Sequence, residues 1–207
     1  MQNEINSTIY KTPFTKSYWK DAFSELKSVK KIIIAALFIA LTLVVRSFFI
    51  PIPVMGGQRI YFTFFVKALG AVIYGPILSG ISGGISDLIG ALLFPSGPFF
   101  IGYTITSILS SFIYGIFLYR VKLTVVRIFL AKFSVNILAN VLVNSLWSAI
   151  LMGKGYWLLV IARLPKNLIL LPFEVAIMVT FFAIMIPITK KQKVINYSPF
   201  EKKITWF

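Results

Sequence analysis

The feature that most constrains the fold is a long apolar sequence that is almost free of charge. Residues 32–119 contain only four charged side chains, Arg46, Arg59, Lys67 and Asp87, and the whole chain of 207 residues is 58% hydrophobic and 13% charged. A soluble domain carries about a quarter charged residues along its length. The sequence therefore predicts one integral membrane domain.

Proline and glycine divide this apolar sequence into six segments. Pro51 and Pro53 end the first, and Gly75 with Pro76 separates the second from the third. A transmembrane helix needs about 20 residues, so the third is short, whereas the last is long enough for its first turns to form a separate surface element. The predicted fold is all-α, an integral membrane bundle of six transmembrane helices. The expected spans are residues 32–50, 61–77, 79–94, 101–119, 124–152 and 157–188.

Lysine and arginine predict the orientation of these spans. Three basic clusters precede the first span, occupy the fourth connection and follow the last span: Lys20, Lys27, Lys30 and Lys31; Arg120, Lys122 and Arg127; Lys190, Lys191 and Lys193. With six spans, all three lie on one side if both termini are cytoplasmic. This distribution explains the formal net charge of +15 without a nucleic-acid partner.

Two basic tails flank the membrane domain of residues 32–188. Residues 1–31 are expected to form a cytoplasmic tail without a signal peptide, and residues 189–207 a second one. Between residues 18 and 31, five apolar side chains share one helical face: Trp19, Ala22, Phe23, Leu26 and Val29. This pattern suits an amphipathic helix lying on the inner leaflet. A solvated extension of the first span explains it equally well.

Several kinds of chemistry are excluded by what the sequence lacks. The chain has no Cys and no His, which excludes disulfides and imidazole acid–base catalysis. It has no GxxxxGK[ST] motif for ATP hydrolysis. We therefore expect a binding or carrier protein with no cofactor and no metal. The alternative is a membrane enzyme acting on lipid, with Asp87 and Glu174 as its acid–base pair.

A polar stripe crosses the apolar sequence of residues 125–152. Lys132, Asn136, Asn140, Asn144 and Ser148 recur every four residues, so in a helix they lie almost above one another. Amides inside a membrane are costly unless they face protein, water or a ligand. The stripe predicts a hydrogen-bonding cavity for a polar solute, with Asn140 and Asn144 as ligand contacts.

A second polar face begins the last span. Arg163, Asn167 and Glu174 share this face, and Lys166 lies beside it. Charged groups in a span are candidates for function, so Arg163, Lys166 and Asn167 are predicted to bind the ligand. The alternative is that Arg163 and Lys166 reach lipid headgroups while Glu174 pairs with a neighbouring lysine.

The charge balance away from the inner surface indicates the charge of the ligand. Six bases there oppose two acids, Asp87 and Glu174, an excess of four. The bases are Arg46, Arg59, Lys67, Lys154, Arg163 and Lys166. Such a cavity fits an anionic solute with a hydrogen-bonding head, and Arg59 is a candidate contact. Asp87 is expected to be a buried ion-pair partner of Lys67 or Arg46.

Aromatic and small residues complete the candidate set. Aromatic side chains near polar positions at the outer ends can stack on a planar ring, although an interfacial aromatic belt is an equal explanation. They are Tyr61, Phe62, Phe99, Phe100, Tyr103 and Trp147. The pairs Ala36 with Ala40 and Gly80 with Gly84 allow another helix to approach closely.

A resemblance to a known family rests on three stretches. Residues 74–104, YGPILSGISGGISDLIGALLFPSGPFFIGYT, resemble the S-components of energy-coupling factor (ECF) vitamin transporters. Within them, residues 95–104 are most similar to the folate-specific branch, as is the sequence from Arg163 and Lys166 to Glu174. Ala36 and Ala40 match the family's AxxxA motif. The resemblance covers about residues 32–188.

This resemblance implies a six-helix substrate-binding domain in the bacterial plasma membrane. It implies partners as well: a transmembrane coupling protein and two cytoplasmic ATPases. The first three helices would contact the coupling protein, through Ala36, Ala40, Gly80 and Gly84, and the outer loops with the last three helices would form the vitamin pocket, including Thr104. Folate suits the surplus cations, because its glutamate tail carries two carboxylates. The alternatives are riboflavin, which is neutral, and thiamine, which is cationic.

Overall fold

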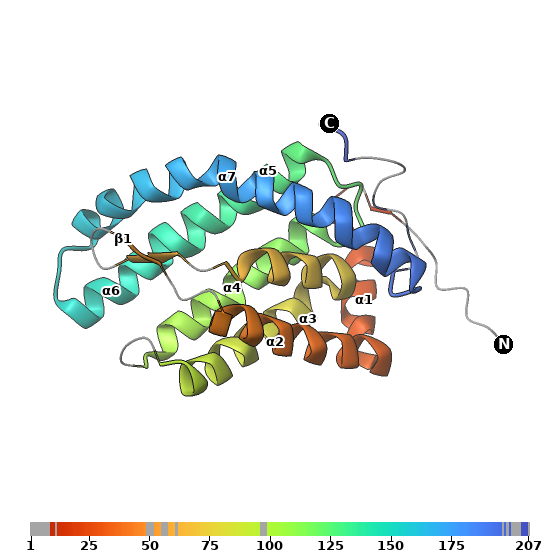
Figure 1. Cartoon of the computed structure of the whole chain (residues 1–207), viewed down its shortest axis with the longest axis horizontal. Helices are drawn as coiled ribbons and strands as arrows, with labels where there is room; N and C mark the ends of the chain where they lie inside the picture. The colour runs from red at the N-terminus through yellow and green to blue at the C-terminus, as the bar shows by residue number, and fades with distance from the viewer. Residues whose placement is uncertain are drawn as a thin grey trace.

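The computed structural model describes residues 9–10, 12–48, 52–54, 58–60, 62–95, 99–195, 197, 199 and 204–206, with backbone alone in 52–54 and 58–60. It is a bundle of helices that run along one long direction (Figure 1). The helices are α1 (Lys16–Ser24), the 3₁₀ turn η1 (Glu25–Lys27), α2 (Val29–Phe48), α3 (Phe64–Leu93), α4 (Ile101–Leu118), α5 (Val125–Ser134), the π-helix η2 (Val135–Val143), α6 (Asn144–Met152) and α7 (Tyr156–Lys191).

Five of the described helices are long and apolar enough to cross a membrane. They are Val29–Phe48, Phe64–Leu93, Ile101–Leu118, Val125–Met152 and Tyr156–Lys191. Four of them match expected spans within about three residues. Prolines and glycines separate some of these helices, such as Gly153 and Gly155 between Met152 and Tyr156, although neither residue type follows Leu118 or Lys191 directly. The last is continuous through Pro165, so the separate element considered at its start does not form.

Helix α3 takes in the expected second and third spans, and the chain turns back on itself inside it. Gly75 has φ +80° and ψ 176°, a conformation open to glycine and not to other residues, and Pro76 follows. Lys67 donates to Ser107 Oγ over 2.7 Å, and Ser107 donates to the Gly83 carbonyl over 2.8 Å. Residues on either side of the break therefore lie at the same level of the bundle. The first arm, residues 64–74, is shorter than the roughly 20 residues that a span needs.

A short β-hairpin among the described residues was not predicted from the sequence. Strands β1 (Ile52–Val54) and β2 (Gln58–Ile60) pair antiparallel, with Ile52 opposite Ile60. The β-branched residues of this segment favour strand, but three-residue strands give no readable alternation. The described part of the chain is thus the expected helical bundle, with one short hairpin between α2 and α3.

The core lies around α3, which α4 covers closely. Gly80 and Gly84 are buried against Ile108 of α4. This face of α3 is therefore occupied inside the chain, and the docking role of Gly80 and Gly84 stays a prediction. On α2, by contrast, Ala36 and Ala40 are both exposed.

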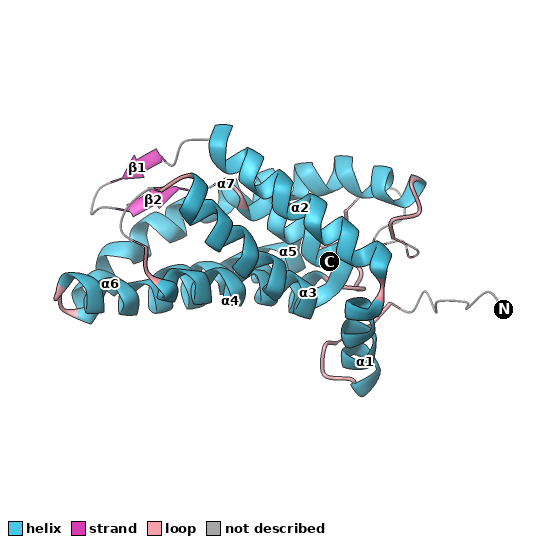
Figure 2. Ribbon diagram, turned by 90° about the horizontal axis from the view of Figure 1, so that it is seen from below, coloured by secondary structure: helices cyan, strands magenta, loops and turns pink. Residues whose placement is uncertain are grey.

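Helix α1 runs across one end of the bundle and projects beyond its side (Figure 2). Lys30 Nζ donates to the Lys193 carbonyl over 2.6 Å, so the start of α2 and the segment after α7 lie at this same end. The buried face of α1 carries Tyr18 and Ala22. Phe23, which the sequence placed with Ala22 on one apolar face, is 57% exposed.

Candidate ligand-binding site

The polar stripe lies on one continuous rod, Val125–Met152, whose middle is the π-helix η2. A π-helix has i→i+5 hydrogen bonds and is rare, and short π segments often occur at functional sites. A π turn takes up more residues than an α turn, so side chains four apart meet at a different angle from that in an α-helix, and Asn136 and Asn140 still touch. The sequence has no local signal for this change of pitch.

A relay of hydrogen bonds begins at a buried ion pair in this rod. Lys132 Nζ lies 3.0 Å from Glu174 Oε1, and Lys132 is 2% exposed. Asn136 donates its Nδ2 to Glu174 Oε2 over 2.9 Å and to the Asn167 carbonyl over 3.1 Å. Asn140 in turn donates its Nδ2 to Asn136 Oδ1 over 3.1 Å. The alternative that Glu174 pairs with a lysine is confirmed.

The charged end of the relay fixes the direction of each amide. An ammonium group only donates, and a carboxylate only accepts. Asn136 must therefore turn its amine towards Glu174, which leaves its Oδ1 to accept from Asn140. Asn140 then keeps its own Oδ1 as an acceptor. Lys132 and Glu174 were not predicted as site residues, yet they determine what Asn140 presents.

Asn144 provides a second acceptor, four residues after Asn140 on the same helical segment. Its Oδ1 is buried and has no hydrogen-bond partner among the described residues. A buried amide oxygen without a partner is unfavourable by about 1–3 kcal/mol, so a ligand donor at this position would stabilise it. Asn140 and Asn144 are thus brought together as two carbonyl acceptors.

An aromatic cluster lies beside these acceptors on α4 and α6. The ring centroid of Phe100 is 5.8 Å from that of Trp147 and 6.0 Å from that of Tyr103. Trp147 Nε1 donates to Thr106 Oγ1 over 3.1 Å. A Cβ on Gly102 would overlap Phe100 and Trp147, so only glycine permits this approach.

The cluster is formed by three of the six aromatics singled out from the sequence, and a fourth, Phe99, lies away from it. Tyr103 and Trp147 belong to it, but Phe99 is 59% exposed and Phe100 takes the inward place. The two phenylalanines are adjacent, and sequence alone does not decide which one faces inward.

Arg163 joins the aromatic cluster to the last helix. Its Nη2 donates to Ser148 Oγ over 2.6 Å, and the same oxygen lies 3.3 Å from the Tyr103 hydroxyl. Asn167 is buried, and its Nδ2 donates to the Arg163 carbonyl over 2.9 Å, so it supports the helix and the relay. Lys166 is partly exposed on the neighbouring face.

The remaining predicted residues fall away from this cluster or outside the described part. Thr104 is buried and donates to Asp87 Oδ2 over 2.9 Å. Asp87 lies 3.8 Å from Arg46, which confirms one of the two expected ion pairs. Tyr61 and the side chain of Arg59 lie outside the described residues.

The family model described as "ECF transporter, substrate-specific component" matches residues 30–186, which is most of the chain. The chain belongs to this family. The match begins at the start of α2 and ends near the end of α7, so α1 and the residues after α7 lie outside it.

Relatives of this substrate-specific component include two curated proteins and a solved structure. The folate transporter FolT of Clostridium novyi is 36% identical over 150 residues, covering 72% of this chain and 86% of that protein. The folate transporter FolT of Leuconostoc mesenteroides is 30% identical over 154 residues, covering 72% and 82%. The crystal structure of FolT bound with folic acid is 32% identical with a TM-score of 0.64, covering 72% of this chain and 88% of that one.

Proposed function

We propose that this substrate-specific component binds folate and delivers it into the cell as part of an ECF transporter. The observation that carries the proposal is the polarised relay, which ends in two amide carbonyls beside an aromatic cluster and an arginine. The similarity to proteins named folate transporters, and to a FolT bound with folic acid, supports the same ligand.

The pterin ring of folate matches the acceptor pair. Its 2-amino group and N3–H are neighbouring donors on one edge, so each can meet one of the Oδ1 atoms of Asn140 and Asn144. The flat ring can stack against Trp147 or Tyr103, since aromatic pairs gain about 0.5–1.5 kcal/mol beyond burial.

The glutamate tail of folate matches Arg163. A guanidinium has five N–H donors, and one hydrogen bond to Ser148 leaves others for a carboxylate. Bidentate pairing of arginine with carboxylate is strong and directional. Lys166, Arg59 and Tyr61 are further proposed contacts at the outer end.

The energy for transport is proposed to come from partners. The chain carries no P-loop, so a transmembrane coupling protein and two cytoplasmic ATPases would supply it. We place the exposed pair Ala36 and Ala40 of α2 against the coupling protein.

The same proposal assigns the membrane orientation. The proposed count of six crossings includes both arms of α3, although the first arm is shorter than a full span, and it places both tails, residues 1–31 and 189–207, in the cytoplasm of a bacterial cell. The contact between Lys30 and Lys193 supports tails on one side.

Other ligands and an enzymatic function fit the site less well. Riboflavin is neutral and leaves Arg163 without a counterpart, and thiamine brings a cation to a cationic site. A lipid-modifying enzyme would need Asp87 and Glu174 as acid and base, but Arg46 and Lys132 are paired with them.

Calorimetry on the detergent-solubilised protein tests the ligand. Folate should bind near 1:1 without ATP, and riboflavin and thiamine should not bind. If either of these vitamins bound while folate did not, the folate assignment would be wrong.

A further inference from the structure

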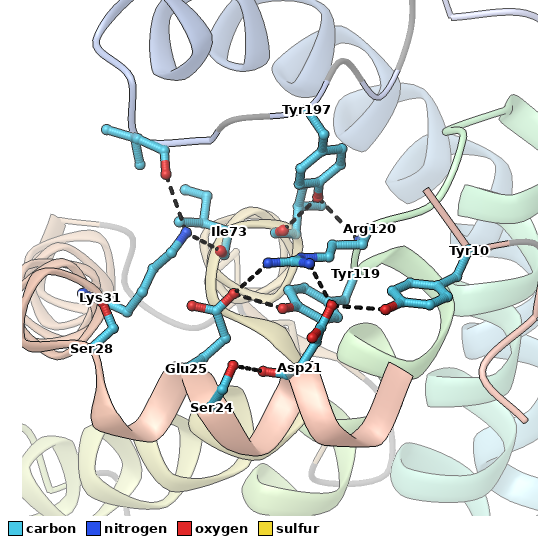
Figure 3. Close-up of polar contacts among 12 residues, drawn as sticks. Tyr10, Asp21, Ser24, Glu25, Ser28, Lys31, Ile73, Tyr119, Arg120 and Tyr197 are labelled. Carbon is cyan, nitrogen blue, oxygen red and sulfur yellow. Dashed lines mark hydrogen bonds and ion pairs between the residues drawn. The ribbon is translucent and has the colours of Figure 1, made fainter. Parts of the chain in front are cut away.

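Arg120 organises a polar cluster at the end of the bundle where α1 lies (Figure 3). Its Nη1 is 2.6 Å from Asp21 Oδ2, and its Nη2 is 3.4 Å from Glu25 Oε1. The Tyr10 hydroxyl donates to the same Asp21 oxygen over 2.7 Å, and the Tyr119 hydroxyl donates to Glu25 over 2.6 Å. Burial, and then the charge of Glu25, raises the pKa of Tyr119, so this hydroxyl keeps its proton and remains a donor.

The backbone of Arg120 is held as firmly as its side chain. Its φ of +47° lies in the left-handed region, which few non-glycine residues adopt. The Tyr10 amide donates to the Arg120 carbonyl over 2.7 Å, and the Arg120 amide donates to the Tyr197 hydroxyl over 3.1 Å. Tyr197 in turn donates to the Val72 carbonyl over 2.8 Å. Both tails therefore meet at this residue.

These contacts decide which face of α1 is turned outwards. Asp21 and Glu25, the two acids of this segment, face Arg120, and the Tyr18 hydroxyl donates to the Gly115 carbonyl over 2.9 Å. A buried ion pair fixes orientation because a rotated helix would leave charges unpaired. α1 is thereby locked at one rotation.

The outward side of α1 is consequently basic and aromatic. The lysines Lys16, Lys20 and Lys27 are exposed, and Phe23 is 57% exposed between them. Phe14, just before the helix, is 90% exposed. We call Phe14, Lys16, Lys20, Phe23 and Lys27 the α1 outer face. In the sequence, Asp21 and Glu25 lie between Lys20 and Lys27. In the structure these two acids face Arg120, so they are separated from the lysines of the α1 outer face.

We propose that the α1 outer face docks on anionic phospholipid headgroups of the cytoplasmic leaflet. Three lysines and no acid give the required charge complementarity, and the two phenyl rings can enter the interface, as in amphipathic helices that lie on membranes. The position agrees, because α1 crosses the end of the bundle and projects beyond its side, over the surrounding lipid (Figure 2). The side of the membrane rests on the proposed function.

General electrostatics gives the expected strength of the attraction between the α1 outer face and anionic lipid. A basic residue near an anionic leaflet favours the docked state by about fivefold, so replacing three lysines should lower the docked-to-undocked ratio by about a hundredfold. Salt weakens such an attraction, because the Debye length falls to about 3 Å at 1 M.

The experiment uses the full chain in nanodiscs, and the absence of native cysteine makes single labelling clean. A Phe23→Cys variant carries an environment-sensitive fluorophore in place of the ring. Its emission should shift to the blue in discs containing phosphatidylglycerol compared with phosphatidylcholine alone, and the shift should vanish in high salt. Adding Lys16→Gln, Lys20→Gln and Lys27→Gln should abolish it.

A second labelling site, far from α1, serves as the control. The same fluorophore at Lys154→Cys, exposed in the loop at the opposite end, should not respond to lipid charge. Equal emission in both lipids, or a response that survives the lysine replacements, overturns the proposal. So does a response that needs the coupling module, because that assigns the face to a protein partner. Folate binding is measured separately in the same discs. A failure of the proposed folate function can therefore be told apart from a failure of lipid docking by α1.

Discussion

Substituting Glu174 tests the hydrogen-bond relay most directly, because this carboxylate neutralises Lys132 and orients Asn136. Glu174→Gln leaves a buried lysine without its anion, which we expect to destabilise the fold by about 3–5 kcal/mol. Adding Lys132→Met should restore much of the stability. Folate affinity should remain at least tenfold weaker in the double variant, since a neutral relay no longer dictates which atom Asn140 presents. Thermal unfolding and calorimetry give the two readouts, and wild-type affinity in the double variant would reduce the relay to a structural role.

At Asn144 the expected effect is on binding alone. Asn144→Ala removes the unpartnered Oδ1 and should weaken folate by about 1–3 kcal/mol, the usual cost of an unmet donor on the ligand. Ser145→Ala is the matched control, because Ser145 is the neighbouring buried residue on the same rod and is not placed in the site. Equal affinities for both variants would remove Asn144 from the pocket.

Among the elements, α1 is held to the bundle by the ion pairs of Arg120, beside the contacts of Tyr18 and Tyr119. Arg120→Leu leaves Asp21 and Glu25 without their cation, so α1 should detach and its amides should exchange hydrogen faster. Folate binding at the other end should be unchanged. Lys122→Gln, two residues further on and exposed, should change neither measurement. Unchanged exchange in Arg120→Leu would show that apolar packing of Tyr18 and Ala22 suffices.

The elements also show where sequence reasoning succeeds and where it stops. Helix ends were predictable because Pro51, Gly75 and Gly153 terminate or break helices by local backbone chemistry. The π-helix and the small hairpin were not, since neither leaves a periodic pattern. In the candidate site, residue types such as Asn140 and Arg163 were found from charge and spacing. The choice between Phe99 and Phe100, and the burial of Gly80 against α4, depend on tertiary contacts that no local pattern records.

At the scale of the whole molecule, the proposed recognition site and the proposed coupling face lie on different helices. The acceptors and aromatic cluster belong to α4, η2, α6 and the first half of α7, whereas Ala36 and Ala40 are exposed in the middle of α2. In the proposed ECF transporter, the loaded subunit would meet its coupling protein through a surface of this kind. Small residues let a partner helix approach closely, so a large side chain there should block transport without touching the pocket.

Ala40→Trp therefore tests the carrier function as a whole. ATP-driven folate uptake by the reconstituted transporter should be lost, while calorimetry on the isolated subunit shows unchanged affinity. Ile161→Trp is the control for adding a bulky ring to an exposed face, since Ile161 is 66% exposed on α7, and it should transport normally. Loss of binding together with uptake, in a protein that still unfolds cooperatively, would place α2 in the pocket. Normal uptake in Ala40→Trp would show that this face of α2 does not meet the coupling protein.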